Sequence, residues 1–231
     1  MIKSVLSKLC GFGIPINNEI PVLYILGFII DKIIEIFWGV TKFRRLRLVF
    51  VKRTARIDCA NSIKFGQNLR IGSYSYINAL SKDGIEIGNN VSFGMYSSVI
   101  CTGTLFGPLG KGLKIGNNVG MGTHGFWGCA GGIEIGNDTI MGNYVTAHSE
   151  NHNFDDISKP IREQGVNRKG IKIGNGCWIC SKVTILDGTI IGDGVIVAAG
   201  SVVKGIIPSN CIVAGVPAKI VKYRGNHTDK M

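Results

Sequence analysis

Aliphatic side chains recur at every sixth position through most of the chain after about residue 57. The longest uninterrupted run consists of Ile173, Ile179, Ile185, Ile191, Val197 and Val203. An α-helix would repeat every 3.6 residues, and a strand with one buried face would repeat every two. A period of six therefore predicts short strands separated by sharp corners. Three such strands close one coil of about 18 residues, with the aliphatic side chains stacked inside.

Small and amide residues accompany the repeat. Glycine follows the aliphatic residue at Ile71, Ile87, Ile115, Ile135, Ile173 and Ile191. Glycine lets the chain turn tightly, and nearby Asn or Asp tolerates the unusual backbone angles of a corner. A single coil cannot bury its own apolar face, so the coils must stack. We predict a mainly β protein whose central part is a parallel β-helix solenoid.

The repeat breaks at residues 100–112, 122–133 and 148–171. Insertions that leave a rigid solenoid project from one face, which is often the binding face. The longest one carries most of the polar and ionisable residues of the central region, so we predict an extruded loop there. The expected organisation is an N-terminal helical and basic segment (1–54), a β-helix catalytic domain (55–215) and a C-terminal tail (216–231).

Residues 21–40 are the most apolar stretch, but they contain Asp31, Lys32 and Glu35. A membrane span needs about 20 mostly apolar residues with few or no charges, so a span is not expected. Residues 42–56 carry seven Lys or Arg and no acid. Two interpretations remain open: an interfacial helix with a basic flank on an anionic membrane, or a helix packed against the protein body or a second subunit. Nucleic-acid binding is a third reading, but the rest of the chain offers no recognition motif.

Composition narrows the class of protein. The net charge is +11, and most of it comes from residues 42–56. A hydrophobic content of 45% excludes disorder, because enough apolar surface is available for burial. The seven cysteines are odd in number and scattered, unlike a disulfide framework. Since no signal peptide is clear, we expect reduced thiols and a cytoplasmic protein, with association with the cytoplasmic membrane face left open by the N-terminal segment.

Three phrases carry a resemblance to a known family. They are SENHNFDD (149–156), IKIGNGCWIC (171–180) and VAAGSVVKGIIPSNCIVAGVPAKIV (197–221). Together with the six-residue repeat, they resemble the hexapeptide-repeat acyltransferases, above all the sugar and polysaccharide O-acetyltransferases such as the galactoside and maltose enzymes. The resemblance covers about residues 55 to 224. It implies a left-handed β-helix, a homotrimer, and acetyl-coenzyme A as donor in a cleft between subunits.

Transfer of an acyl group from a thioester to a hydroxyl needs a base, and histidine suits this because its pKa lies near the operating pH. The chain has four histidines: His124, His148, His152 and His227. The position of His152 matches the family's catalytic histidine, so the resemblance implies that His152 takes the acceptor's proton. His148 is the rival base. A loop histidine bonded to a backbone group is the structural alternative for His152.

A carboxylate should orient the base by holding its other ring nitrogen. Glu150, Asp155 and Asp156 are the local candidates, and each could instead be a solvated loop charge. The second break contains His124 and Trp127, where the relatives keep acceptor-binding groups. The resemblance therefore suggests these two residues for the acceptor.

The donor site also follows from the resemblance. The positions that match it are Trp178, Ser181, Ala199, Lys204 and Lys219. Trp178 would border the cleft, Ser181 and Ala199 would offer backbone amides to the pantetheine arm, and the lysines would lie near the phosphates. Two departures weaken the match: a cysteine stands at position 180 where the family has glycine, and Lys204 is displaced by one position. The structural alternatives are core packing for Trp178, a repeat position for Ser181 and solvated charge for the lysines.

The function expected from these features is direct transfer of acetyl from acetyl-coenzyme A to a sugar or polysaccharide hydroxyl. One alternative is a zinc enzyme like the gamma-class carbonic anhydrases, which would use His124, His148 and His152 as ligands. Another is a non-catalytic solenoid that binds glycans. We expect no metal, and we read the Cys177-x-x-Cys180 pair as repeat positions. The acceptor, the acyl length and the choice of oxygen or nitrogen stay open.

Overall fold

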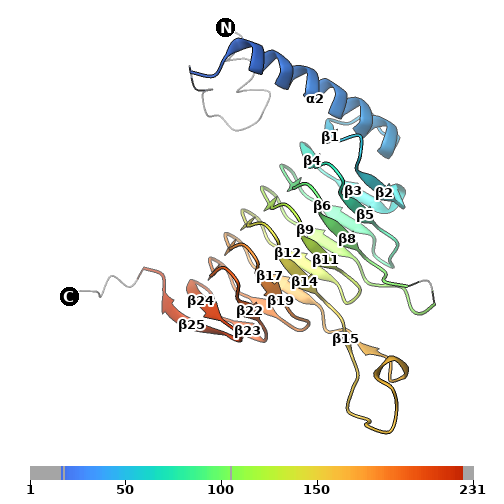
Figure 1. Ribbon diagram of the computed structural model, residues 1–231, viewed down its shortest axis with the longest axis vertical. Coiled ribbons are helices and arrows are strands. Elements are labelled where there is room, and N and C mark those ends of the chain that lie inside the picture. The colour runs from blue at the N-terminus through green and yellow to red at the C-terminus, as the bar shows by residue number, and fades with distance from the viewer. Residues whose placement is uncertain (1–16, 18, 105, 226–231) are drawn as a thin grey trace.

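The chain winds as a left-handed parallel β-helix with one long helix at its N-terminal end (Figure 1). The structure is a computed structural model and describes residues 17, 19–104 and 106–225. Each complete coil contributes one strand to each of three sheets, in which successive coils pair in parallel. The three-sided solenoid predicted from the six-residue period is therefore confirmed. His227 and Cys10 lie outside the described residues.

We name each sheet after its first strand. The β1 face holds β1 (Val49–Val51), β4 (Leu69–Ile71), β7 (Ser92–Phe93), β10 (Gly120–Met121), β13 (Ile140–Met141), β18 (Trp178–Ile179), β21 (Ile196–Val197), β24 (Cys211–Gly215) and the antiparallel β25 (Ala218–Tyr223). The β2 face holds β2 (Arg56–Asp58), β5 (Tyr76–Asn78), β8 (Ser98–Ile100), β11 (Phe126–Gly128), β14 (Thr146–His148), β19 (Thr184–Ile185) and β22 (Val202–Val203). The β3 face holds β3 (Ile63–Phe65), β6 (Ile85–Ile87), β9 (Leu113–Ile115), β12 (Ile133–Ile135), β17 (Ile171–Ile173), β20 (Ile190–Ile191) and β23 (Ile206–Ile207).

The remaining elements lie outside these faces. They are helix α2 (Val22–Phe43), the 3-10 helices η1 (Ala60–Ser62) and η2 (Ile161–Glu163), and the hairpin strands β15 (Asn151–His152) and β16 (Val166–Asn167). Strand β1 lies within the segment 1–54 and pairs in parallel with β4. The solenoid therefore begins at Val49, several residues before the boundary drawn from the repeat.

The inward positions of the repeat form one continuous core. Ile173 pairs in register with Ile191, and Ile179 pairs with Val197. All four side chains are buried. Each aliphatic side chain thus lies on its equivalent in the next coil, which is how stacking buries the face that one coil leaves open.

The predicted break at 122–133 is wrong, because this segment is a regular coil. Met121, Trp127 and Ile133 keep the six-residue spacing and all point inward. Trp127 is only 1% exposed and lies in register between Val99 and Ala147. The small Ala147 side chain leaves room for the indole. Because the side chain is enclosed in the core, Trp127 cannot contact an acceptor, and the prediction that it binds one is wrong.

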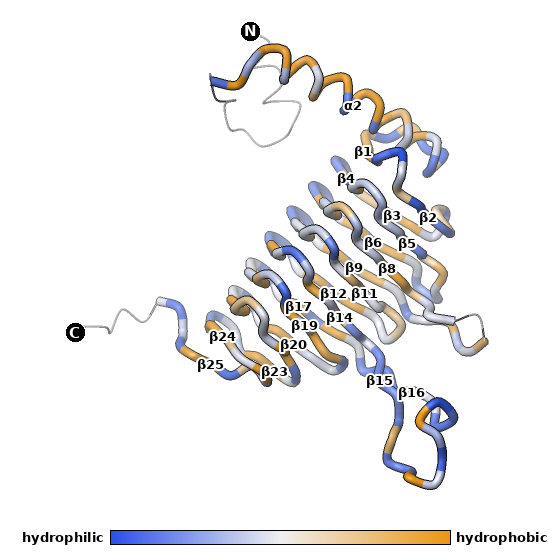
Figure 2. Tube along the Cα trace, viewed as in Figure 1, coloured by the Kyte–Doolittle hydropathy of each residue, from blue (hydrophilic) through white to orange (hydrophobic). Residues whose placement is uncertain are grey.

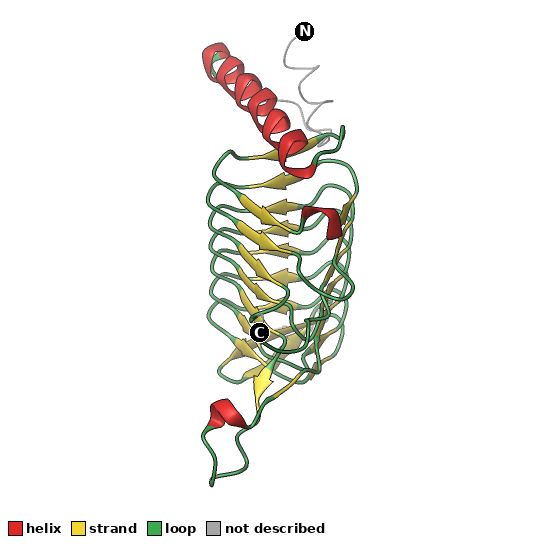
Figure 3. Ribbon diagram, turned by 90° about the vertical axis from the view of Figure 1, so that its right-hand side faces the viewer, coloured by secondary structure: helices red, strands yellow, loops and turns green. Residues whose placement is uncertain are grey.

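Helix α2 lies across the N-terminal end of the solenoid (Figure 3). It is hydrophobic along most of its length (Figure 2). Its Glu35 nevertheless faces the protein: this side chain is 5% exposed and pairs with Lys32 at 2.6 Å and with Lys52 at 2.9 Å. Within the described residues, no helix has the length and apolar content needed to cross a membrane.

Candidate functional site

The longest insertion forms a projecting hairpin that carries His152. It leaves the solenoid after β14 of the β2 face and returns at β17 of the β3 face (Figure 3). Within it, Asn151 pairs with Asn167 and His152 with Val166 in antiparallel register. The His152 side chain is exposed. The extruded loop predicted from the break is thus a short hairpin with an ordered base.

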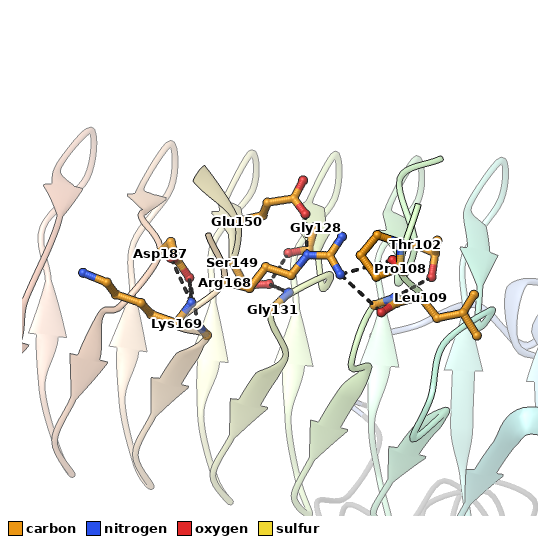
Figure 4. A network of polar contacts seen from close by, with 12 residues as sticks. Thr102, Pro108, Leu109, Gly128, Gly131, Ser149, Glu150, Arg168, Lys169 and Asp187 are labelled. Carbon is orange, nitrogen blue, oxygen red and sulfur yellow. Dashed lines mark hydrogen bonds and ion pairs between the residues drawn. The ribbon is translucent and has the colours of Figure 1, made fainter. Parts of the chain in front are cut away.

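An arginine anchors the base of this hairpin. Arg168 Nε lies 2.6 Å from Glu150 Oε2, and Arg168 Nη1 donates to the carbonyl oxygens of Pro108 and Leu109 at 3.2 Å each (Figure 4). The contacts join the insertion at 148–171 to the insertion at 100–112. Glu150 is therefore engaged with Arg168, a residue that no sequence motif singles out.

Two buried polar side chains fix the ends of the insertion to the coils. Ser149 Oγ donates to the Gly128 carbonyl at 2.7 Å and accepts from the Gly131 N–H at 2.9 Å. Asp187, 4% exposed, accepts from the Gly170 N–H at 2.8 Å where the chain rejoins the solenoid (Figure 4). Buried acceptors of this kind hold a turn in one conformation, because an unpaired N–H would be costly.

His148 lies on the sheet itself, four residues before His152. It ends strand β14, and its ring lies 5.3 Å from the ring of Phe126, centroid to centroid. Partial burial lowers the pKa of His148 from its ordinary value, because the charged imidazolium is poorly solvated there. A neutral imidazole can accept a proton, so His148 is chemically suited to act as a base.

The candidate orienting acids do not contact His152. Among the residues that the structure describes, no hydrogen bond or ion pair joins His152 to Glu150, Asp155 or Asp156. Asp156 accepts from Ser158 and lies 3.2 Å from Lys159 Nζ. These contacts hold the pKa of Asp156 below its usual value, with the Ser158 hydrogen bonds as the larger cause. The acid that would orient His152 stays unassigned.

His124 belongs to a different place on the molecule. It lies at the corner between the β1 and β2 faces, in a stack of rings with Tyr74, Tyr96 and Tyr144 whose successive centroids are 5.1, 4.8 and 4.6 Å apart. All four residues have positive φ between 57° and 60°. The spacings of 22, 28 and 20 residues hide this stack in the sequence, because coil lengths vary with the insertions.

The three histidines of the zinc alternative are therefore not gathered within one chain. His124 lies at one edge of the β2 face, whereas His148 and His152 lie at the other edge. Among the described residues, no three His, Cys, Asp or Glu side chains are grouped so that they could hold a metal ion.

Three of the predicted donor residues share one edge. Trp178 is 50% exposed on the β1 face, in register with Ile140 and Ile196. Ser181 and Ala199 lie at the corner between the β1 and β2 faces in consecutive coils, where the Ser181 carbonyl accepts from the N–H after Ala199 at 3.0 Å. The edge thus presents an exposed indole beside a corner of small residues.

The two predicted lysines lie elsewhere. Lys204 is exposed at the corner between β22 and β23, the opposite edge of the β2 face. Lys219 lies on β25 and pairs with Ala214 of β24, at the C-terminal end of the β1 face. Lys219 therefore shares a face with Trp178, whereas Lys204 lies away from the donor edge of its own chain.

The donor edge and the hairpin lie on opposite edges of the β2 face of one chain. His152 leaves at the corner between the β2 and β3 faces, and Ser181 lies at the corner between the β1 and β2 faces. No contact joins His152 to Trp178, Ser181 or Ala199 among the described residues. One chain therefore presents the two halves of the predicted site separately.

Comparisons with known proteins agree with this fold. Residues 170–205 match the family model for the bacterial transferase hexapeptide (six repeats). A probable acetyltransferase of Mycobacterium tuberculosis is 41% identical over 92 residues, which cover 40% of this chain and 31% of that protein. A putative lipopolysaccharide biosynthesis O-acetyl transferase of Escherichia coli is 40% identical over 106 residues, which cover 43% of this chain and 54% of that protein. The match thus spans between about a third and about half of these relatives.

A solved structure extends the similarity to most of the chain. An N-acyltransferase from Bacillus cereus, in complex with dTDP and coenzyme A, has a TM-score of 0.54 and 19% sequence identity. The alignment covers 78% of this chain and 83% of that one. At this identity the likeness concerns the fold alone.

Proposed function

We propose that this chain is an O-acetyltransferase that uses acetyl-coenzyme A and acetylates a sugar or polysaccharide hydroxyl, and the match of residues 170–205 to the bacterial transferase hexapeptide model supports this class. The observation that carries the proposal is the ordered hairpin, which holds His152 clear of the coils on a base anchored by Glu150 and Arg168. Relatives described as acetyltransferases support the donor class.

The proposed mechanism is direct transfer in a ternary complex. The His152 imidazole takes the proton from the acceptor hydroxyl as its oxygen attacks the thioester carbonyl. Main-chain N–H groups near the donor edge would stabilise the oxyanion that forms. The carbon–sulfur bond then breaks, the new ester bond remains, and the imidazolium returns its proton to the coenzyme A thiolate. No acyl-enzyme intermediate is needed.

The separation of the two halves in one chain supports a homotrimer as part of the proposal. A neighbouring copy would bring its donor edge, with Trp178, Ser181 and Ala199, to the hairpin of the first copy. Lys204 and Lys219 stay proposed phosphate contacts, and Lys204 would serve a neighbouring site because of its position. Acetyl transfer of this kind would take place in the cytoplasm, where the cysteines stay reduced.

The test compares His152→Asn with His148→Asn in purified protein. Acetyl-coenzyme A is supplied with a panel of mono- and oligosaccharides, and thiol release is followed with a colorimetric reagent. Loss of the base should lower kcat by about 10²- to 10⁴-fold in the His152 variant. Arg162→Gln is the control, because Arg162 is exposed on the same hairpin and has no proposed role in the reaction.

The outcomes separate the two bases. A deep loss in the His152 variant with near-normal activity in the His148 variant supports the assignment. A large loss of kcat only in the His148 variant would identify His148 as the base. A wild-type protein that neither binds acetyl-coenzyme A nor releases thiol overturns the proposed activity and favours the glycan-binding alternative.

A further inference from the structure

Helix α2 has an apolar face that turns away from the protein. Its buried face consists of Ile25, Glu35, Gly39 and Phe43. Its outward apolar residues are Val22, Leu23, Leu26, Ile30, Ile33, Ile34 and Phe37, which are 45 to 81% exposed. At about 100° per residue, these seven positions fall within one stripe that covers about a third of the helix circumference.

The polarity of this helix is reversed relative to an ordinary surface helix. Glu35 points toward the solenoid and pairs with Lys32 and Lys52, and Asp31 lies 3.8 Å from Lys52 Nζ. Glu35 is neutralised against the first coil, whereas the Asp31 side chain is 62% exposed and lies beside the apolar stripe, which itself contains no charged residue. A stripe of large apolar side chains on the surface normally marks an interaction site.

A basic segment follows the helix in the chain. The segment 36–57 contains seven Lys or Arg residues and no Asp or Glu. Directly after the helix, Arg44 is exposed and Leu46 is 94% exposed. Arg53 and Lys42 both lie over the Trp38 ring, 5.7 Å from its centroid. The apolar stripe therefore continues into a basic segment that also exposes a leucine.

We propose that the outer face of α2, with residues 44–48, docks in the interface of an anionic lipid bilayer. An amphipathic helix with a basic flank lies in the membrane plane, inserts its apolar side chains and neutralises acidic headgroups. Residues 22–37 extend about 24 Å, enough for a stable interfacial contact. Parallel pairing of this face with a second copy would bring two acid-free basic segments together, which costs Coulomb repulsion.

This docking would orient the solenoid. The helix covers the first coil, and the hairpin with His152 leaves the solenoid several coils farther along (Figure 1). The N-terminal coil would therefore face the bilayer, while the hairpin would stay on the aqueous side. The inference does not depend on the proposed acetyl transfer.

The test measures co-sedimentation of the full chain with sucrose-loaded vesicles. Vesicles of phosphatidylcholine with 30% phosphatidylserine are compared with phosphatidylcholine alone, each at low and high salt. We expect at least tenfold stronger binding to the anionic vesicles, reduced severalfold at high salt because screening shortens the reach of the cations.

Two variants address the two parts of the surface. Ile30→Gln with Ile33→Gln should reduce anionic-vesicle binding by at least tenfold, whereas Ile206→Gln, an exposed isoleucine at the far end of the solenoid, should not change it. Arg44→Glu should also reduce binding, and Lys222→Glu should not. Circular dichroism checks that the variants are folded.

Light scattering supplies the competing outcome. If the wild-type protein binds neither kind of vesicle, and the Ile30/Ile33 variant forms a smaller oligomer than wild type, the face is a subunit interface and the proposal is overturned. Equal binding of the Ile30/Ile33 variant and wild type also overturns it. Loss of vesicle binding with an unchanged mass supports it.

Discussion

Replacing Arg168 by Gln should release the hairpin from the solenoid without unfolding the protein. The ion pair with Glu150 at 2.6 Å is partly exposed, so it contributes about 0.2–1 kcal/mol. The two hydrogen bonds to the carbonyls of Pro108 and Leu109 come from a charged donor and add roughly 1 kcal/mol each. The variant should therefore lose about 2–3 kcal/mol of local stability, which corresponds to roughly a 30- to 150-fold rise in the open hairpin population.

Two measurements follow this loss independently. Hydrogen exchange should show protection of the hairpin amides falling by about 30- to 150-fold, while the core strands and the melting temperature change little. If catalysis needs the anchored hairpin, kcat/KM for acetyl transfer should fall by about 10- to 100-fold. Arg162→Gln is the control, since Arg162 is exposed on the same hairpin. Hairpin protection and kcat/KM both within twofold of wild type would refute the anchoring role.

Three further changes test the packing around the site. Asp187→Ala should lower the free energy of unfolding, measured by urea denaturation, by about 3 kcal/mol, because buried N–H groups lose their acceptor. The control Asp155→Ala should lower it by less than about 0.5 kcal/mol. Trp127→Ala should cost about 3–5 kcal/mol, measured by urea denaturation, and Trp127→Phe should cost less because the indole N–H has no partner among the described residues. Stability should decline as pH falls below the ordinary histidine pKa of 6.5, because the unfolded state takes up the His148 proton first. In His148→Asn, the free energy of unfolding, measured by denaturation at a series of pH values, should change less with pH in that range.

The solenoid could be predicted from the sequence because its contacts repeat at a fixed spacing along the chain. An inward residue every sixth position meets the same residue type in the next coil, as Ile173 meets Ile191. Nothing distant is needed to see that pattern. It misled at 122–133 only because the inward residue there is Trp127 rather than an aliphatic one. The spacing of six was intact, and spacing rather than residue type carries the fold.

The candidate site was readable only in part. Ser181 and Ala199 occupy equivalent repeat positions in consecutive coils, and Trp178 lies three residues before Ser181, so their common edge follows from the period. The anchor between Arg168 and the carbonyls of Pro108 and Leu109 joins residues about sixty positions apart. Two insertions of unrelated length meet there, and no periodicity relates them. The ring stack of His124 does occupy equivalent corner positions, each three residues after an inward residue, but the unequal lengths of the coils conceal the alignment.

The sequence by itself determined that the chain must stack short strands around an aliphatic core, and that a long polar insertion interrupts them. Only the tertiary structure decided which surfaces lie together. Helix α2 is apolar nearly all round, so its sequence cannot say which face packs. That choice depends on Lys52, which pairs with Glu35 and turns the charged side inward. The outward apolar face results from a contact between two segments, and a pattern within one segment cannot show it.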